Sequence, residues 1–196
     1  RAMTFWNPEN PPRVTVMGGS QGARRMNSVI REAAELLMLQ KVAVQFSILG
    51  EAAENSANVE NIEYVDNPTA LLGKSSLVIS RSGSGSLAEI AGIGVPSILV
   101  PYPYAKDGHQ LRNAEMFHAT GASVLIPEAE LTPVLAASSI RDLISDSGRL
   151  SKMAASAHAL ACPGAASRIC DEVEQSLRIA AIPNRNAQVR TGGGVA

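Results

Sequence analysis

The chain has 196 residues, of which 45% are hydrophobic and 18% are charged, and its formal net charge is −1. This length suits one well-buried domain and is short for two. The 17 lysines and arginines are scattered along the sequence, which argues against a nucleic-acid partner, since such proteins concentrate basic residues on one face.

The sequence also disfavours a membrane-spanning protein, a secreted protein and a metal site. No apolar run reaches the length of about 20 residues that a membrane-spanning helix needs, and the opening RAMTFWNPENPP lacks the apolar core of a signal peptide. Cys162 and Cys170 form no CxxC pair and have no histidine at metal-ligand spacing, so we expect reduced thiols, no metal and no cofactor. The chain begins at Arg1 rather than at methionine, as a fragment would.

Short apolar segments rich in β-branched residues alternate with segments of helical periodicity. The expected strands are 13–19, 44–50, 61–65, 76–81 and 97–102, and the expected helices are 23–39, 69–74, 86–94 and 109–122. Strands separated by helices imply βαβ units. The pattern therefore predicts an α/β fold, a Rossmann-like doubly wound parallel sheet with helices on both faces.

The rest of the chain reads differently. After the apolar run at 122–127 we expect a mostly helical tail over 131–179, broken at Gly148 and at Pro163-Gly164. The last stretch is polar and rich in glycine, which predicts disorder. We expect three parts, namely an N-terminal segment or linker at 1–13, one domain at 14–178 and a disordered tail at 179–196.

A glycine turn follows the first expected strand. The residues GGSQGA at 18–23 contain Gly19, Ser20 and Gln21 and lead directly into a helix. Glycines allow close approach of the backbone to a bound group, and the N–H groups at a helix start favour an anion, so we expect a phosphate or pyrophosphate here. The Ser20 hydroxyl could contact such a group or cap the helix.

The order of residues in this turn weakens two common assignments. It is not GxGxxG, because position 20 is serine, and it is not a P-loop, because GK[ST] is missing. A nicotinamide-dependent oxidoreductase would also need an acidic residue at the end of the second strand, and Glu51 is the candidate for that position.

A second turn, SGSGS at 82–86, lies between Arg81 and Glu89. It should share the carboxyl edge of the sheet with the first turn. We expect Glu89 in the first turn of the following helix, where it could either accept hydrogen bonds from a diol such as a ribose or simply stabilise its own helix. The planar donor fork of Arg81 needs a partner, either a carboxylate of the protein or a ligand phosphate.

A third polar cluster follows the strand at 97–102. After a proline-rich loop, His109 and Gln110 begin a helix, and Asn113 lies one turn later. Polar groups at a helix start could contact sugar hydroxyls, although an isolated histidine there could equally be a capping or surface residue.

Together, GGSQGA, the SRSG turn with the glutamate of AEIAGIGVPSILVP, and HQLRNA closely resemble the C-terminal domain of the MurG family of UDP-N-acetylglucosamine transferases. The resemblance runs from about Val14 to Leu177 and implies the donor-binding half of a two-domain GT-B glycosyltransferase. It implies a donor site in which Ser20 contacts the phosphates, the backbone of Val65 reads the uracil edge, and Glu89 holds the ribose hydroxyls. The remaining implied donor contacts are Gly19, Gln21, Arg81, Gly83, Ser84, Gly85 and Ser86 around the diphosphate and sugar, and His109, Gln110 and Asn113 at the N-acetylglucosamine.

The resemblance also implies an activity and partners. The family transfers N-acetylglucosamine with inversion from UDP to the lipid-linked acceptor lipid I, giving lipid II for peptidoglycan synthesis, at the inner face of the bacterial membrane. The acceptor and membrane surfaces, with the proposed catalytic base, belong to an N-terminal domain that this sequence lacks, so we expect no catalytic residue here. Gly85 departs from the bulkier residue that the family often has. The alternative is a non-catalytic sugar-nucleotide-binding subunit acting with a separate membrane-attached chain.

Overall fold

The computed structural model describes residues 6–18, 23–50 and 53–180. Within these residues six strands form one sheet: β1 (Arg13–Met17), β2 (Gln45–Leu49), β3 (Val59–Ile62), β4 (Leu77–Ser80), β5 (Ser97–Leu99) and β6 (Ser123–Leu125). Every pairing is parallel, and the strand order is β3-β2-β1-β4-β5-β6. The predicted doubly wound parallel α/β fold is confirmed.

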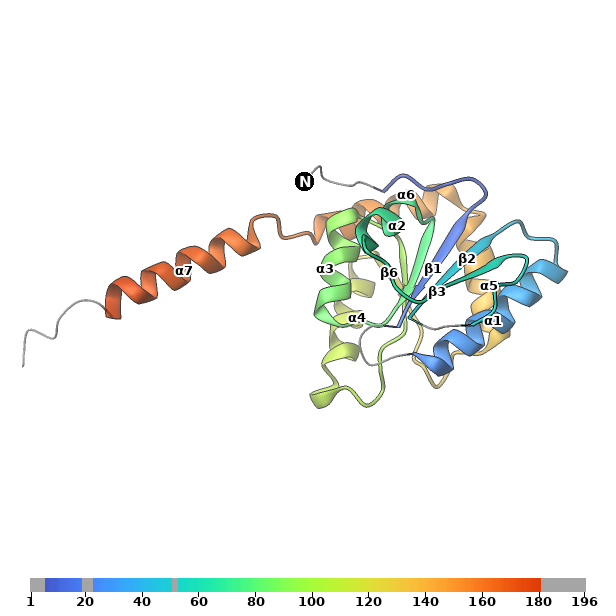
Figure 1. Ribbon diagram of the computed structural model, residues 1–196, viewed down its shortest axis with the longest axis horizontal. Helices are drawn as coiled ribbons and strands as arrows, with labels where there is room; N and C mark the ends of the chain where they lie inside the picture. Colours follow the sequence, from blue (N-terminus) through green and yellow to red (C-terminus); the bar gives the residue numbers. More distant parts are fainter. Residues whose placement is uncertain (1–5, 19–22, 51–52, 181–196) are drawn as a thin grey trace, which may run out of the picture. The chain divides into compact units, whose positions relative to one another are not determined.

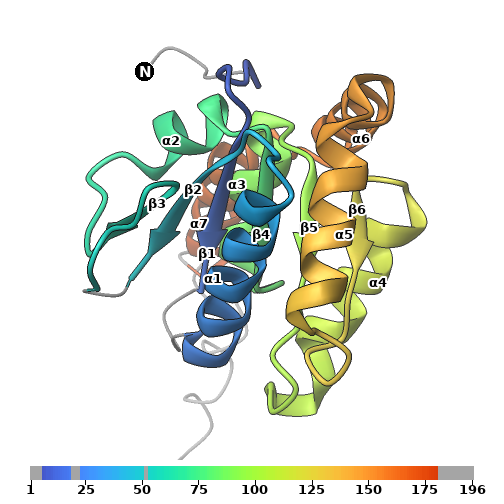
Figure 2. The ribbon, with the colours of Figure 1, turned by 90° about the vertical axis from the view of Figure 1, so that its right-hand side faces the viewer.

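The helices are α1 (Arg24–Leu39), α2 (Pro68–Lys74), α3 (Ser84–Ile93), α4 (His109–Ala119), α5 (Pro133–Ile144), α6 (Ser147–Ala159) and α7 (Ala165–Ala180), with a short 3₁₀ turn, η1, at Lys106–Gly108. Figure 2 shows α1 and α5 side by side in front of the sheet. Their buried residues, which include Ile30 and Ile140, form one hydrophobic cluster with apolar residues of β1 and β4. The opposite face is covered by α2, α3 and α4, whose buried residues include Leu72, Ile90 and Phe117. Figure 1 shows the two layers on either side of the strands.

Alternation along the strands separates the two cores. In β1, Val14 and Val16 join the cluster under α1 and α5, whereas Met17 joins the cluster under α3. Neighbouring strand residues point to opposite faces, and both faces of a doubly wound sheet are covered, so apolar residues of one strand contribute to both cores.

Helix starts follow local capping chemistry. Asn67 caps α2 by accepting from the Ala70 N–H, Thr132 caps α5, and Asp146 caps α6. The helix α3 ends at Gly94, which has φ +76°, and a Cβ there would lie 3.0 Å from Cβ of His158. Only glycine fits this left-handed position.

Several expected boundaries differ from the structure. The third strand is 59–62 rather than 61–65, and β6 was not among the five expected strands. Gly148 does not break the helical tail, because α5 ends at Ile144 and Gly148 lies inside α6, just after its Asp146 cap. The break near Pro163-Gly164 is confirmed, since α6 ends at Ala159 and α7 begins at Ala165.

The segment before β1 is held along the amino edge of the sheet. The Trp6 indole N–H donates to Ser75 O at 2.8 Å, and the Asn7 and Glu9 amides donate to Gly73 O and Lys74 O at 2.8 and 2.9 Å. Trp6 also packs against both hydrophobic clusters. The residues at 6–12 are therefore part of the folded unit.

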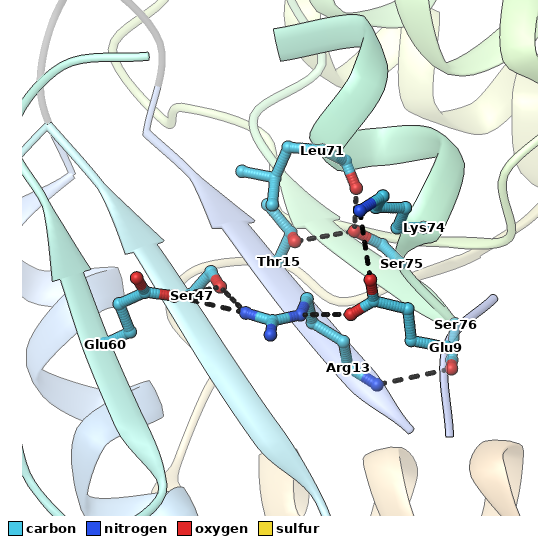
Figure 3. A network of polar contacts seen from close by, with 9 residues as sticks. All are labelled: Glu9, Arg13, Thr15, Ser47, Glu60, Leu71, Lys74, Ser75 and Ser76. Atoms are coloured by element: carbon cyan, nitrogen blue, oxygen red, sulfur yellow. Dashed lines mark hydrogen bonds and ion pairs between the residues drawn. The ribbon is translucent and has the colours of Figure 1, made fainter. Parts of the chain in front are cut away.

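A chain of polar contacts continues this anchoring (Figure 3). Arg13 connects Glu9 at 3.3 Å with Glu60 at 3.2 Å, and Lys74 binds the other carboxylate oxygen of Glu9 at 3.2 Å. The hydrogen bond from Lys74 lowers the pKa of Glu9. The network ties the N-terminal segment to the starts of β1 and β4 and to β3, at the end of the sheet opposite the predicted ligand site.

The chain divides into two compact units, the first ending at Ala161 and the second beginning at Cys162. The first contains the sheet and α1 to α6. The second contains α7, whose Ile169, Val173 and Leu177 recur every fourth residue and are exposed. Cys162 and Cys170 are free and exposed in this unit. The tail was predicted at 179–196. Residues 179 and 180 belong to α7, so that part of the prediction is wrong, and residues 181–196 lie outside the described residues.

Candidate functional site

The carboxyl ends of β1 and β4 meet at the point where the strand order reverses. Met17 lies opposite Ser80, and the amide of Arg81 donates to Met17 O at 3.3 Å. From β1 the chain proceeds outward to β2 and β3, and then returns to build β4, β5 and β6 on the other side. Ligands of open α/β sheets bind in the crevice at such a switch point, so the loops after β1, β4 and β5 define the candidate site.

The second glycine turn presents an open helix start. The first intrahelical bond of α3 runs from the Leu87 amide to Gly83 O at 3.0 Å, so the N–H groups of Ser84, Gly85 and Ser86 precede the helical ladder. A Cβ built on Gly83 or Gly85 would meet no atom within 4 Å. Packing within the described chain therefore does not require glycine at either position.

Glu89 lies one turn further along α3 than the sequence suggested. The helix begins at Ser84, and its first turn contains no acidic residue. The predicted first-turn position of Glu89 is wrong. Glu89 therefore does not stabilise α3 through the helix dipole, because that effect is confined to the first turn. Glu89 is solvent-exposed, yet partial desolvation by its surroundings raises the pKa of its carboxyl group. A carboxylate so placed gains from an added hydrogen-bond donor.

Arg81 has its partner inside the protein. Its Nη2 donates to Oε1 of Glu128 at 3.0 Å, and both side chains are buried. The sequence left two partners open for Arg81, a carboxylate of the protein or a ligand phosphate. In the structure the partner is the carboxylate of Glu128. Sequence reasoning missed Glu128, because it lies 47 positions from Arg81 and outside every motif.

The start of α4 is joined to the second turn. The Ser82 hydroxyl donates to Gln110 O at 2.7 Å, and the Asn113 amide donates back to Ser82 O at 3.0 Å. Asn113 thus supports the helix internally. The side-chain oxygen of Gln110 accepts from the Tyr102 amide at 3.0 Å, which leaves the amide NH₂ of that side chain as its donor group.

His109 begins α4 and is exposed. Its Nδ1 lies 2.7 Å from Lys106 O. A carbonyl oxygen can only accept, so Nδ1 carries the hydrogen, and Nε2 is the acceptor of the neutral ring.

Of the remaining predicted residues, the structure describes only Val65. Val65 is half-buried in the loop between β3 and α2. Gly19, Ser20, Gln21 and the alternative Glu51 lie outside the described residues. The N-cap position of α1 is Ala23, not Ser20.

The described residues contain neither a candidate metal site nor a helix suited to cross a membrane. Over residues 6–18, 23–50 and 53–180, no group of three or more histidine, cysteine, aspartate or glutamate side chains is placed to hold a metal ion. In the same part of the chain, no helix combines the length and apolar character needed to cross a bilayer.

Known proteins resemble this chain in sequence and in fold. Residues 13–169 match the glycosyltransferase family 28 C-terminal domain. A relative from Nostoc punctiforme, named UDP-N-acetylglucosamine--N-acetylmuramyl-(pentapeptide) pyrophosphoryl-undecaprenol N-acetylglucosamine transferase, is 35% identical over 173 residues, which cover 86% of this chain and 48% of the relative. The protein of the same name from Synechococcus elongatus is 37% identical over 179 residues, covering 86% and 48%.

The crystal structure of Acinetobacter baumannii MurG superposes with a TM-score of 0.73 at 24% identity, covering 88% of this chain and 54% of that one. This likeness supports the fold. The chain spans about half the length of the curated relatives it matches. Because the family match extends from β1 into α7, the chain belongs to the glycosyltransferase family 28 C-terminal domain family.

Proposed function

We propose that this chain is the UDP-N-acetylglucosamine-binding half of an inverting glycosyltransferase that converts lipid I to lipid II in peptidoglycan synthesis. The observation that carries the proposal is the family match over residues 13–169, with relatives that are named for this transfer. The candidate site adds an open glycine turn at the switch point and a nearby exposed carboxylate of raised pKa.

The proposed donor site follows the loops of the carboxyl edge. The phosphates lie at Ser20 and at the amino end of α3, where Gly83 to Ser86 offer backbone donors. The carboxylate of Glu89 accepts from the ribose hydroxyls, and the backbone of Val65 meets the uracil. Gln110, through its amide NH₂, and His109 contact the N-acetylglucosamine.

The chemistry assigned to this half is leaving-group stabilisation. In the transfer, the bond from the sugar C1 to the diphosphate oxygen breaks, and a bond forms from C1 to the 4-hydroxyl oxygen of the muramoyl unit. The hydroxyl proton passes to a base, and UDP leaves as an anion. Backbone N–H groups at the start of α3 stabilise that developing charge, because they are already oriented before the reaction.

Acceptor and membrane contacts are assigned to a second domain. The relatives are about twice as long as the segment that this chain matches, and we place the lipid-linked acceptor and the membrane-facing surface in that other half. The proposed location is the inner face of the bacterial cell membrane, as a peripheral protein.

A thermal-shift comparison tests the function. A ligand that binds only the native state raises its apparent stability, so UDP and UDP-N-acetylglucosamine should raise the midpoint of unfolding, and NADH should leave it unchanged. Stabilisation by GDP equal to that by UDP would remove the uracil contact from Val65. Failure of both uridine nucleotides to stabilise the chain would overturn the proposal.

A further inference from the structure

A buried ion pair, Arg81–Glu128, lies beside the proposed donor site and makes none of the donor contacts of the proposed function, although the sequence resemblance implied one for Arg81. The side chains of Arg81 and Glu128 are 6% and 9% exposed, and Nη2 of Arg81 is 3.0 Å from Oε1 of Glu128. A charge removed from water needs a partner. Among the described residues, Nε of Arg81 has no acceptor. The hydrogen bonds of Nη1 and Nη2 therefore offset the cost of burying the guanidinium charge.

The guanidinium of Arg81 connects three segments that are far apart in the sequence. Its Nη1 donates to Val100 O at 3.2 Å and to Pro101 O at 3.3 Å, where the chain leaves β5. Its central carbon lies 5.4 Å from the ring centre of Tyr102, within the range of a cation–π contact. Its Nη2 reaches Glu128 in the loop after β6. One side chain at the end of β4 thus connects the ends of β5 and β6.

Two further hydrogen bonds connect these segments to the start of α4. The Tyr102 amide donates to the side-chain oxygen of Gln110, and the Ser82 hydroxyl donates to the main-chain oxygen of the same residue. Ser82 directly follows Arg81 and precedes the Gly83 turn. The orientation of the Gln110 side chain therefore depends on Tyr102, and the position of Tyr102 depends on the guanidinium.

We propose that Arg81 and Glu128 act as a positioning pair that holds the loop between β5 and α4 against the glycine turn, so that Gln110 and His109 are oriented to recognise the sugar of the donor. The pair acts through protein groups and does not touch the nucleotide. This inference rests on the proposed donor-binding function. It assigns to Glu128 a role in distinguishing UDP-N-acetylglucosamine from UDP.

Two binding measurements separate this role from simple fold stabilisation. Glu128→Gln keeps an oxygen acceptor for Nη2 but removes the charge, and Glu130→Gln is the matched control, because Glu130 is exposed in the same loop. By calorimetry, Glu128→Gln should weaken UDP-N-acetylglucosamine about five- to tenfold, as expected at the low end of coupling between sites, with little change for UDP. Glu130→Gln should leave both affinities unchanged.

Two further variants keep the test decisive if Glu128→Gln folds poorly. Tyr102→Leu leaves the ion pair in place and should give a smaller loss of the same selective kind. Arg81→Lys keeps the charge but not the planar fork, and it should weaken UDP-N-acetylglucosamine selectively, as Glu128→Gln does.

Each contrary result has its own meaning. Equal weakening of UDP and UDP-N-acetylglucosamine by Glu128→Gln, or no weakening of either, would overturn the positioning role. Failure of the wild-type chain to bind any uridine nucleotide would instead overturn the proposed function.

Discussion

Glu89 is the residue whose ionisation the proposed ribose contact uses. Its carboxyl pKa is raised above 4.5 by desolvation, so the ionised form is disfavoured in the free protein. The native state then holds the proton more tightly than the unfolded chain does. Glu89 therefore contributes stability at acid pH, and that contribution is lost as the pH rises through the raised pKa.

Donor binding should show the opposite pH trend. Ribose hydroxyls donate to the carboxylate and favour its ionised form, so the affinity for UDP-N-acetylglucosamine should fall as the pH drops from 7 toward the raised pKa of Glu89. In Glu89→Gln this decline should be absent, with weaker binding at pH 7. Calorimetry over this range measures both.

The sugar nucleotide is the right probe for this pH series, because its diphosphate has no terminal phosphate group that titrates near pH 6. A 2′-deoxyribose analogue, which keeps only the 3′-hydroxyl, is the matched ligand control and should show a smaller difference between wild type and Glu89→Gln. Identical pH slopes in the two proteins would remove Glu89 from the ribose contact.

The ion pair at Arg81 illustrates what sequence can show of a single residue. An arginine at the end of a buried strand predicts that a partner for its guanidinium lies nearby. The partner itself is fixed only when β6 lies next to β5 and brings Glu128 to the same edge. A tertiary contact of this kind leaves no local pattern.

At the scale of elements, α3 combines a helix start with an open surface. Gly83 occupies its N-cap with an extended backbone, φ −67° and ψ 149°, which any residue can adopt, and open space surrounds the position of a Cβ. Stability and binding therefore place opposite demands on this position.

Gly83→Ser should separate the two demands. Serine is the better N-cap by a few tenths of a kcal/mol, so the unfolding free energy should be unchanged or slightly higher. The added side chain should weaken UDP-N-acetylglucosamine by about tenfold or more, equivalent to roughly 1.4 kcal/mol. Denaturant unfolding and calorimetry are the two measurements.

Gly92→Ala is the control in the same helix, because Gly92 also has open space around it but lies near the other end of α3. Alanine there should stabilise the helix by roughly 0.5–1 kcal/mol and leave binding unaltered. Undiminished donor affinity in Gly83→Ser would show that the turn does not approach the ligand.

Element existence was predicted more accurately than element position. The first, second, fourth and fifth strands were apolar enough to identify, and α4 begins at His109 as predicted. The third strand was displaced because Ile62, Tyr64 and Val65 look like strand residues. Pairing of Val59 with Phe46 fixes the actual register, and Tyr64 is left 80% exposed. The strand β6 was missed because its residues form part of the apolar run at 122–127, which leads directly into the predicted helical tail.

At the scale of the whole molecule, donor binding and catalysis should separate. The chain spans about half the length of its relatives, and orienting both reactants is a large part of enzymatic rate. Of the remaining histidines, His118 lies in the last turn of α4, where its Nδ1 is 2.9 Å from Ser123 O at the start of β6, away from the site. His158 lies in the last turn of α6.

We therefore expect residues 1–196 to bind UDP-N-acetylglucosamine yet transfer no sugar to a soluble lipid I analogue. Incorporation of radiolabelled N-acetylglucosamine is the measurement. Adding an N-terminal domain of the family, fused or as a separate chain, should give turnover. Transfer by the 196-residue chain alone, free of any full-length enzyme, would mean that the base lies in this half.

The central place of β1 also sets the order in which the polypeptide can fold. During synthesis β1, α1, β2 and β3 leave the ribosome first and can pair, but one edge of β1 has no neighbour until β4 follows, some sixty residues after β1. Part of the apolar face of α1 stays uncovered for longer, because it packs against α5, which follows β4 in the sequence. A nascent chain of intermediate length thus exposes a strand edge and an apolar helix face, both of which favour aggregation. The strand order therefore delays completion of this core until β4 and α5 have been synthesised.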